Sequence, residues 1–122
     1  MPMAILGLEH VNVSITAGGE EAARRFYTGV LELEEIPRPT TLTAKGGVWF
    51  RCGPQELHCG VEETVARSRR HPALLTDDLD AVRARLAAAG ALIGTDGGEI
   101  PGYRRFHTED PFGNRLELLQ RT

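Results

Sequence analysis

The side chains best suited to chemistry in this chain of 122 residues are its four histidines and one glutamate, Glu117. Three of the histidines, His10, His58 and His71, fall in stretches with the pattern of β-strands, as Glu117 does. Imidazole nitrogens together with a carboxylate oxygen suit divalent Zn, Fe, Mn, Ni or Co. Two histidines and one carboxylate already hold a metal ion with open coordination positions. These residues therefore predict a metal centre, provided that the fold brings them together.

Glu117 lies on a strand that follows a tight turn. Residues 110–114 contain a proline, which fixes its own φ, and a Gly-Asn pair, which tolerates positive φ, so the chain reverses there. Side chains alternate across a strand, so Leu116 and Leu118 share one face and the Glu117 carboxylate points to the other. If the leucines are buried, Glu117 faces either a cavity or solvent. Residues 110–119 alone favour neither of the two.

Two parts of the chain show the same order of expected elements. In the first, a strand at residues 4–15 and a helix at 20–30 precede three short strands, at 40–45, 48–52 and 56–61. Residues 31–39 begin as a further strand, which Pro37 and Pro39 break. In the second part, a strand at 71–76 and a helix from 79 to about 90, capped by Asp77 or Asp78, precede strands at 91–95, 103–108 and 116–120.

The repeated order predicts an α+β fold in a single domain, built from two βαβββ modules at residues 1–62 and 70–120. Neither module is large enough to bury its sheet alone, so they should pair, within one chain or between two. The expected result is a curved mixed sheet around a cavity with the helices outside.

The same repeat relates the candidate ligands to one another. His10 and His71 lie at the first strands of the two modules, while His58 and Glu117 lie on the last strands. The separations within the modules agree, because His58 follows His10 by 48 positions and Glu117 follows His71 by 46. Two related strand pairs would thus direct four ligands towards one axis, which favours a metal site over four unrelated side chains.

Composition excludes several other classes of function. The chain has 14 Lys and Arg against 17 Asp and Glu, a formal net charge of -3, which argues against nucleic acid as its main partner. No apolar run has the roughly 18 residues of a membrane span, and residues 1–8 lack the pattern of a secretory signal. A cytoplasmic protein with Cys52 and Cys59 reduced is therefore expected.

Several motifs along the chain together resemble one family. They are Leu8-Glu9-His10-Val11, Arg25-Phe26-Tyr27 followed by Leu31, Leu57-His58, His71-Pro72-Ala73 leading to Asp77-Asp78-Leu79-Asp80, and the stretch from Asp110 to Leu118. Through these motifs, which are spread along nearly the whole chain, the sequence resembles the vicinal oxygen chelate superfamily. Its members include glyoxalase I, fosfomycin-resistance thiol transferases, extradiol dioxygenases and bleomycin-binding resistance proteins, and the motifs separate these members poorly.

The resemblance implies metal positions at His10, His58, His71 and Glu117. Glyoxalase I fills four such positions, commonly with a carboxylate where this chain has His58. The fosfomycin enzymes and extradiol dioxygenases use two histidines and one glutamate, which His10, His71 and Glu117 could supply. His58 is then either a fourth ligand or a pocket residue, and Glu56 on the same strand face could replace it.

Because side chains alternate along a strand, further residues should point towards the same pocket. Asn12 lies two residues after His10, Trp49 and Arg51 share one strand face, and Arg105 and His107 share another. The resemblance implies that the position three before the Asp-Pro turn faces the substrate. His107 is thus a candidate for substrate binding or proton transfer, with a partly exposed strand residue as the alternative.

The leading hypothesis is a divalent-metal lyase resembling glyoxalase I, acting on a small oxygenated metabolite. The metal would act as a Lewis acid that stabilises an enolate or alkoxide, and Glu117, His58 or His107 would serve as the base. A metal-free protein that binds an aromatic or glycopeptide drug, of the bleomycin-resistance type, is the alternative. A dioxygenase or thiol transferase of the superfamily comes third, because dioxygenases are usually longer and Lys45 is the only lysine available to hold a phosphonate. The resemblance also implies a homodimer.

Overall fold

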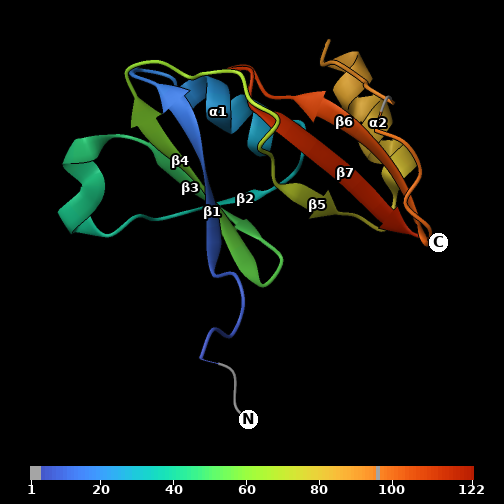
Figure 1. The fold of residues 1–122 in the computed structure, drawn as a ribbon. Helices are drawn as coiled ribbons and strands as arrows, with labels where there is room; N and C mark the ends of the chain where they lie inside the picture. Colours follow the sequence, from blue (N-terminus) through green and yellow to red (C-terminus); the bar gives the residue numbers. More distant parts are fainter. Residues whose placement is uncertain (1–3, 96) are drawn as a thin grey trace.

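The computed structural model describes residues 4–95 and 97–122, which form two small sheets and two α-helices (Figure 1). The first half contains β1 (His10–Thr16), α1 (Glu20–Tyr27), β2 (Glu34–Ile36), a 3₁₀ helix η1 (Thr40–Lys45), β3 (Val48–Cys52) and β4 (Gln55–Glu62). The second half contains β5 (Ala73–Leu75), α2 (Leu79–Ala88), β6 (Tyr103–Glu109) and β7 (Arg115–Arg121). The predicted α+β class is confirmed.

Both sheets are mixed, and each places its own first strand beside its own last strand. The strand order is β1-β4-β3-β2 in one sheet and β5-β7-β6 in the other. β1 and β4 run parallel, and so do β5 and β7, while the other neighbours are antiparallel. The site-bearing strands are therefore joined by crossovers through α1 and α2, as parallel neighbours require.

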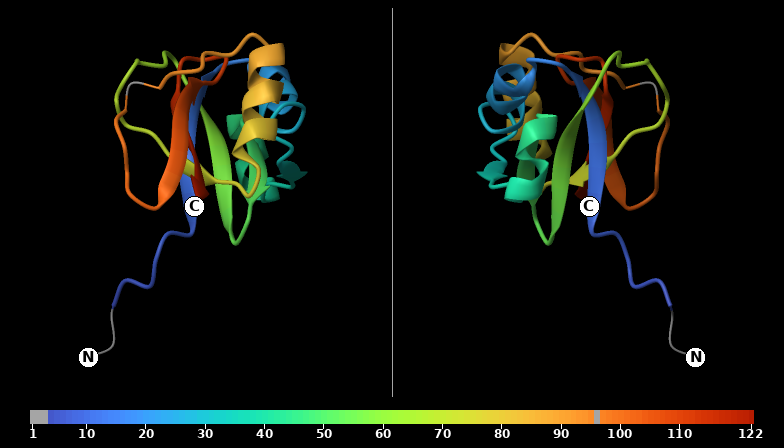
Figure 2. Two further views of the ribbon diagram at one scale, coloured as in Figure 1. Left: turned by 90° about the vertical axis from the view of Figure 1, so that its right-hand side faces the viewer. Right: turned by 90° about the vertical axis from the view of Figure 1, so that its left-hand side faces the viewer.

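Both helices lie on one side of the molecule and leave the other faces of the sheets open (Figure 2). The face under the helices forms a continuous core that includes Tyr27, Phe50, Leu86, Phe106 and Leu116, each less than 3% exposed. The alternation expected for the last strand is observed, because Leu116 and Leu118 of β7 both belong to this core. Polar residues of the same strands are therefore displayed on the open faces.

The structure differs from the sequence-based expectation in three segments. The strand expected at 4–15 begins only at His10. Pro37 and Pro39 break the next strand as expected, because neither has an amide hydrogen to donate within a sheet, and residues 37–45 leave the sheet after a three-residue β2. The expected strand at 40–45 is instead η1, closed by local bonds such as Leu42 N to the Pro39 carbonyl at 2.9 Å. The expected strand at 91–95 is reduced to a single bridge between Gly94 and His107.

The turn between β6 and β7 is built around one buried carboxylate. Asp110 is 5% exposed and accepts hydrogen bonds from the backbone N–H groups of Phe112 and Asn114, each at 2.9 Å. It also accepts the Tyr27 hydroxyl of α1 at 2.7 Å, and the Asn114 side chain donates to the Ser14 carbonyl of β1 at 2.7 Å. Gly113 has φ of +88°, the left-handed region that glycine adopts without strain. This turn thus joins the two halves of the chain.

Two further sequence-based expectations concern the cysteines and the membrane. Cys52 and Cys59 are both free, and burial raises the pKa of the Cys59 thiol to about 12, so the thiol stays protonated at neutral pH. In the described part of the chain, neither helix has the length and apolar character needed to cross a membrane.

Candidate metal centre

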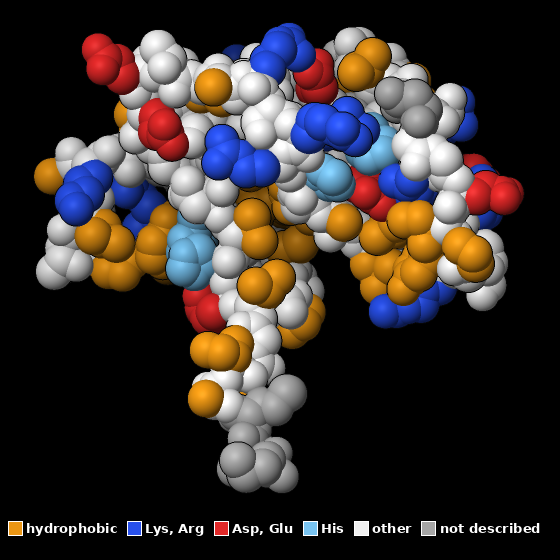
Figure 3. Space-filling model, viewed as in Figure 1, with side chains coloured by type: hydrophobic (Ala, Val, Ile, Leu, Met, Phe, Trp, Pro, Cys, Tyr) orange, Lys and Arg blue, Asp and Glu red, His pale blue; other side chains and the backbone are white. Residues whose placement is uncertain are grey.

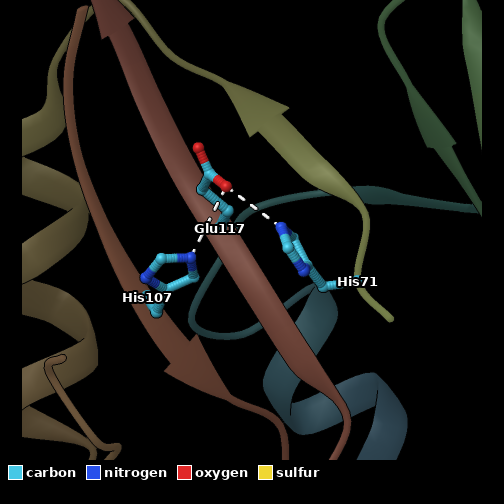
Figure 4. A group of neighbouring side chains, drawn as sticks. All are labelled: His71, His107 and Glu117. Carbon is cyan, nitrogen blue, oxygen red and sulfur yellow. Dashed lines mark hydrogen bonds and ion pairs between the residues drawn. The ribbon is translucent and has the colours of Figure 1, made fainter. Parts of the chain in front are cut away.

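His71, His107 and Glu117 converge on the open face of the second sheet (Figure 4). One ligand atom from each residue lies within 4.8 Å of the other two. Glu117 comes from the middle of β7, His107 from the paired position of β6, and His71 from two residues before β5. The three side chains therefore depend on the register of three neighbouring strands.

The alternation of β7 places Glu117 in the site. Leu116 and Leu118 are 0% and 2% exposed on the core face, and Glu117 on the opposite face is only 6% exposed. Of the two situations open for this carboxylate, a cavity or solvent, the structure shows a buried position among other polar groups. A carboxylate held this far from water requires compensating partners.

The hydrogen bonds of His71 define what its other nitrogen can do. Its Nδ1 lies 2.7 Å from the Arg69 carbonyl oxygen, which only accepts, so the proton of the neutral ring is on Nδ1. Its Nε2 then points a lone pair at Glu117 Oε1, 3.0 Å away. Two acceptors facing each other require either an extra proton or a cation between them. This donor set fits a divalent metal.

His107 faces the same carboxylate oxygen from the other side. Its Nε2 lies 3.5 Å from Glu117 Oε1, and the side chain is about 95% buried. Burial lowers the pKa of His107 below its usual 6.5, the Arg115 charge lowers it further, and Glu117 opposes both effects. His107 is therefore neutral at pH 7 and offers a lone pair, as a metal ligand or a general base requires.

Arg105 adds a positive charge beside this group. Its guanidinium lies 3.4 Å from Glu117 Oε1 and donates to the carbonyls of Gly97 and Gly98. The side chain thus holds the loop at 97–98 close to the carboxylate. It also provides partial charge compensation for Glu117 when no cation is bound.

His10 and His58 lie in a separate cluster on the first sheet. The rings of Trp49 and His58 stack at 3.7 Å between centroids, and His58 and His10 stack at 4.0 Å. His58 Nε2 is 2.9 Å from Glu56, and His10 Nδ1 is 2.6 Å from Glu9. Within one chain the four predicted metal ligands are therefore divided, with His71 and Glu117 in one cluster and His10 and His58 in the other.

The strand registers show why the two clusters look related. His58 is paired with Trp49 on one side, and Glu117 is paired with His107 at the same place of the second sheet. His10 and His71 each lie two residues before the first-strand residue that pairs with His58 or Glu117. Corresponding positions of the two sheets thus carry a His-His-Trp group in one and a His-Glu-His group in the other.

The predicted substrate-binding residues fall into both clusters. Arg105 and His107 lie beside Glu117, whereas Asn12 and Arg51 are exposed on the first sheet near the half-buried Trp49. The sequence-based reading missed His107 as a third possible ligand, because that requires the β6–β7 register. It also missed Arg115, whose charge lowers the pKa of His107. Arg115 lies two residues before Glu117 on β7, so the alternation of side chains could have placed it on the same face.

The comparison with protein families identifies one superfamily. The family model described as the Glyoxalase/Bleomycin resistance protein/Dioxygenase superfamily matches residues 7–118. The chain belongs to this superfamily. The expected resemblance is thereby confirmed, with the three converging residues inside the matched range. Among curated proteins, none matches the chain.

Solved structures show the same fold across different activities. A glyoxalase family protein from Bacillus anthracis is 40% identical, with all of both chains covered and a TM-score of 0.91. The fosfomycin resistance protein FosX from Listeria monocytogenes, in complex with Mn(II) and sulfate, is 19% identical over 97% of this chain and 92% of its own, with a TM-score of 0.75. TnmS3, an antibiotic binding protein from Streptomyces sp. CB03234, is 22% identical over 99% and 100%, with a TM-score of 0.71.

The lowered pKa of His107 predicts a pH dependence of stability in the metal-free protein. Between the folded pKa and the unfolded value of 6.5, the unfolded chain binds a proton that the folded protein does not. We therefore expect the free energy of unfolding to fall as the pH drops below about 6.5 and to level off below the folded pKa. Urea unfolding of wild type and His107→Gln between about pH 5 and 7 measures this difference. Identical pH slopes for the two proteins would contradict it.

Proposed function

We propose that the protein is a divalent-metal enzyme of the glyoxalase type that acts on a small metabolite with two adjacent oxygen atoms. The observation that carries this proposal is the single oxygen, Glu117 Oε1, faced by Nε2 of both His71 and His107. A buried carboxylate with two imidazole nitrogens around it suits Zn, Ni, Mn, Fe or Co. A protein that only sequesters a ligand has no need of this arrangement.

We further propose that His10 of a second copy completes the ligand set with His71 and Glu117. The His10 side chain is 44% exposed, and its Nδ1 is held by Glu9 at 2.6 Å. That bond places the ring proton on Nδ1 and leaves the Nε2 lone pair for a metal. Ile5, Leu6 and Leu8, just before it, are each at least 75% exposed, and a homodimer would cover them.

In this arrangement His58 supports the His10 ligand instead of serving as a fourth one. Its ring is stacked between Trp49 and His10, and Glu56 holds its Nε2. A stacked, hydrogen-bonded ring of this kind fixes the plane of its neighbour. His58 is thus a positioning residue.

The remaining residues of the second sheet have separate tasks in the proposed reaction. A bound divalent metal supplies Lewis acidity towards the two substrate oxygens. His107 is neutral and buried, so its Nε2 can take a proton from a substrate held beside Glu117. Arg105 fixes the loop at 97–98 over the site, which helps to exclude water.

Metal binding is the direct test of this proposal. We expect tag-free wild type to bind about one divalent ion per site and to gain thermal stability from Ni, Zn or Mn. Glu117→Gln should weaken binding by about 100-fold or more, because it removes the charged ligand. Glu34→Gln, at an exposed position of β2 on the first sheet, is the matched control and should leave metal binding unchanged. Metal content by elemental analysis and a thermal shift titration measure both effects. A wild type that binds no metal would contradict the proposal.

Mixing two inactive variants tests whether the site is shared between copies. We expect His10→Ala and Glu117→Ala each to bind little metal alone. After exchange of subunits, a dimer with one chain of each kind has one intact site, or about one ion for every four chains in an equal mixture. No recovery on mixing, together with dimers demonstrated by sedimentation, would show that each site lies within one chain.

One observation favours a second function, the binding of an aromatic drug without metal. The stacked Trp49, His58 and His10 rings form an aromatic surface beside exposed Asn12. If this surface captures drugs, an aromatic or bleomycin-type compound should quench the fluorescence of Trp49, the only tryptophan, in a saturable manner. Glu117→Gln should then bind the drug as well as wild type does. Unchanged fluorescence at high micromolar drug would contradict this function.

A further inference from the structure

The open face of the second sheet changes from charged to apolar one row beyond Glu117. The strand register pairs Glu117 with His107, and in the next row on the same face it pairs Leu119 with Leu75 and Arg105. Neighbouring residues on one face of a strand are about 7 Å apart, so Leu119 lies directly beside the candidate metal centre. We call Leu75 and Leu119 the leucine row.

The two leucines of the row do not belong to the hydrophobic core. Leu74 packs against the core from the other face of β5, and Leu116 and Leu118 are buried in it. Leu75, by contrast, is 54% exposed, and Leu119 is only partly buried on the open face. In the space-filling view, hydrophobic side chains gather at this end of the second sheet, while a group of Lys and Arg side chains lies on the opposite side of the histidines (Figure 3). An uncovered apolar surface beside a polar site is typical of ligand contact.

Arg105, at the β6 end of the same row, is not free to hold a charged ligand. Its guanidinium donates to the carbonyls of Gly97 and Gly98 and lies 3.4 Å from Glu117 Oε1. Gly97 packs so closely against the site that a Cβ atom there would lie 2.6 Å from His107 Cε1. The loop at 97–98 thus closes the β6 side of the site, and the surface that stays open in the row beside Glu117 is uncharged.

We propose that the leucine row selects the substrate by binding an uncharged hydrophobic substituent, an aryl or branched alkyl group, next to the two oxygen atoms. This assignment rests on the proposed function, because it places those oxygen atoms at Glu117. A spacing of about 7 Å lets a group attached to the oxygen-bearing carbons reach Leu119. Substrates with a charged or very small group at this position bury no apolar area on the row and bind less tightly.

The size of the row fits a small substituent rather than a protein partner. An aromatic side chain buries about 150–250 Å², which is of the order that two leucine side chains can cover. A stable protein interface buries about 800 Å² on each partner, several times more than the row offers. The occupant that matches the row in area and in lack of charge is therefore the apolar end of a small molecule.

Two chelating ligands that differ only in their substituent test this assignment. Acetohydroxamate and benzohydroxamate both bind a divalent metal through two adjacent oxygen atoms, and only the second carries a ring. We expect zinc-loaded wild type to bind benzohydroxamate about tenfold or more tightly than acetohydroxamate, because the ring leaves water for the leucine row. Titration calorimetry measures both affinities.

Variants of the row separate its contribution from chelation itself. Leu119→Asn and Leu75→Asn should each reduce the preference for benzohydroxamate to about threefold or less, while zinc binding and acetohydroxamate affinity stay as in wild type. Leu92→Asn, at an exposed leucine outside the row, is the matched control and should keep the full preference. No preference in wild type, or an unchanged preference in both row variants, would overturn the role of the row and leave the proposed metal enzyme standing.

A measurement without metal keeps the row separate from the proposed function. In metal-free protein, benzohydroxamate should shift the nuclear magnetic resonance signals of the Leu75 and Leu119 methyl groups saturably through its ring current, and acetohydroxamate should not. If wild type binds no metal, the proposed function fails and this titration decides the role of the row, which the absence of a saturable shift would overturn. Methyl signals that move with protein concentration before any ligand is added would show that a second copy covers the row, and would also overturn it.

Discussion

The fold depends on the buried carboxylate of Asp110 and the four donors that satisfy it. Two of the donors are backbone N–H groups of its own turn, one is the Asn114 amide, and one is the Tyr27 hydroxyl of the first helix. A charge so far from water is tolerated only when each of these bonds is made, so the turn has a single geometry. That geometry sets where β7 begins and hence which face of the sheet receives Glu117.

A second constraint operates within the site itself. Glu117 Oε1 is approached by two histidine nitrogens and one guanidinium, all within 3.5 Å. Arg105 compensates part of the charge of this carboxylate in the structure. The three groups thus already converge on one oxygen, and the proposed metal binding would require little rearrangement of the second sheet.

Much of this architecture could be predicted from the sequence, because its signals are local. The alternation around Glu117, the helix cap at Asp78 and the breaking effect of Pro37 and Pro39 act within a few residues. The pairing of His71 with Glu117 also followed from the repeated order of elements. The place of His107 beside them could not be predicted, since it depends on hairpin register. The separation of His10 and His58 from the second cluster depends on how two sheets pack, which no local pattern encodes.

The matching registers of the two sheets also bear on the origin of the chain. Trp49 occupies the place of His107, and His58 occupies the place of Glu117, on strands with the same neighbours. This is the relation expected after duplication of an ancestral half-length gene, when each copy is free to change at equivalent positions. One half now carries a group with a buried carboxylate, and the other carries a stacked aromatic one. A single backbone plan has thus diverged into two chemically different surfaces, and selection can alter either without rebuilding the other.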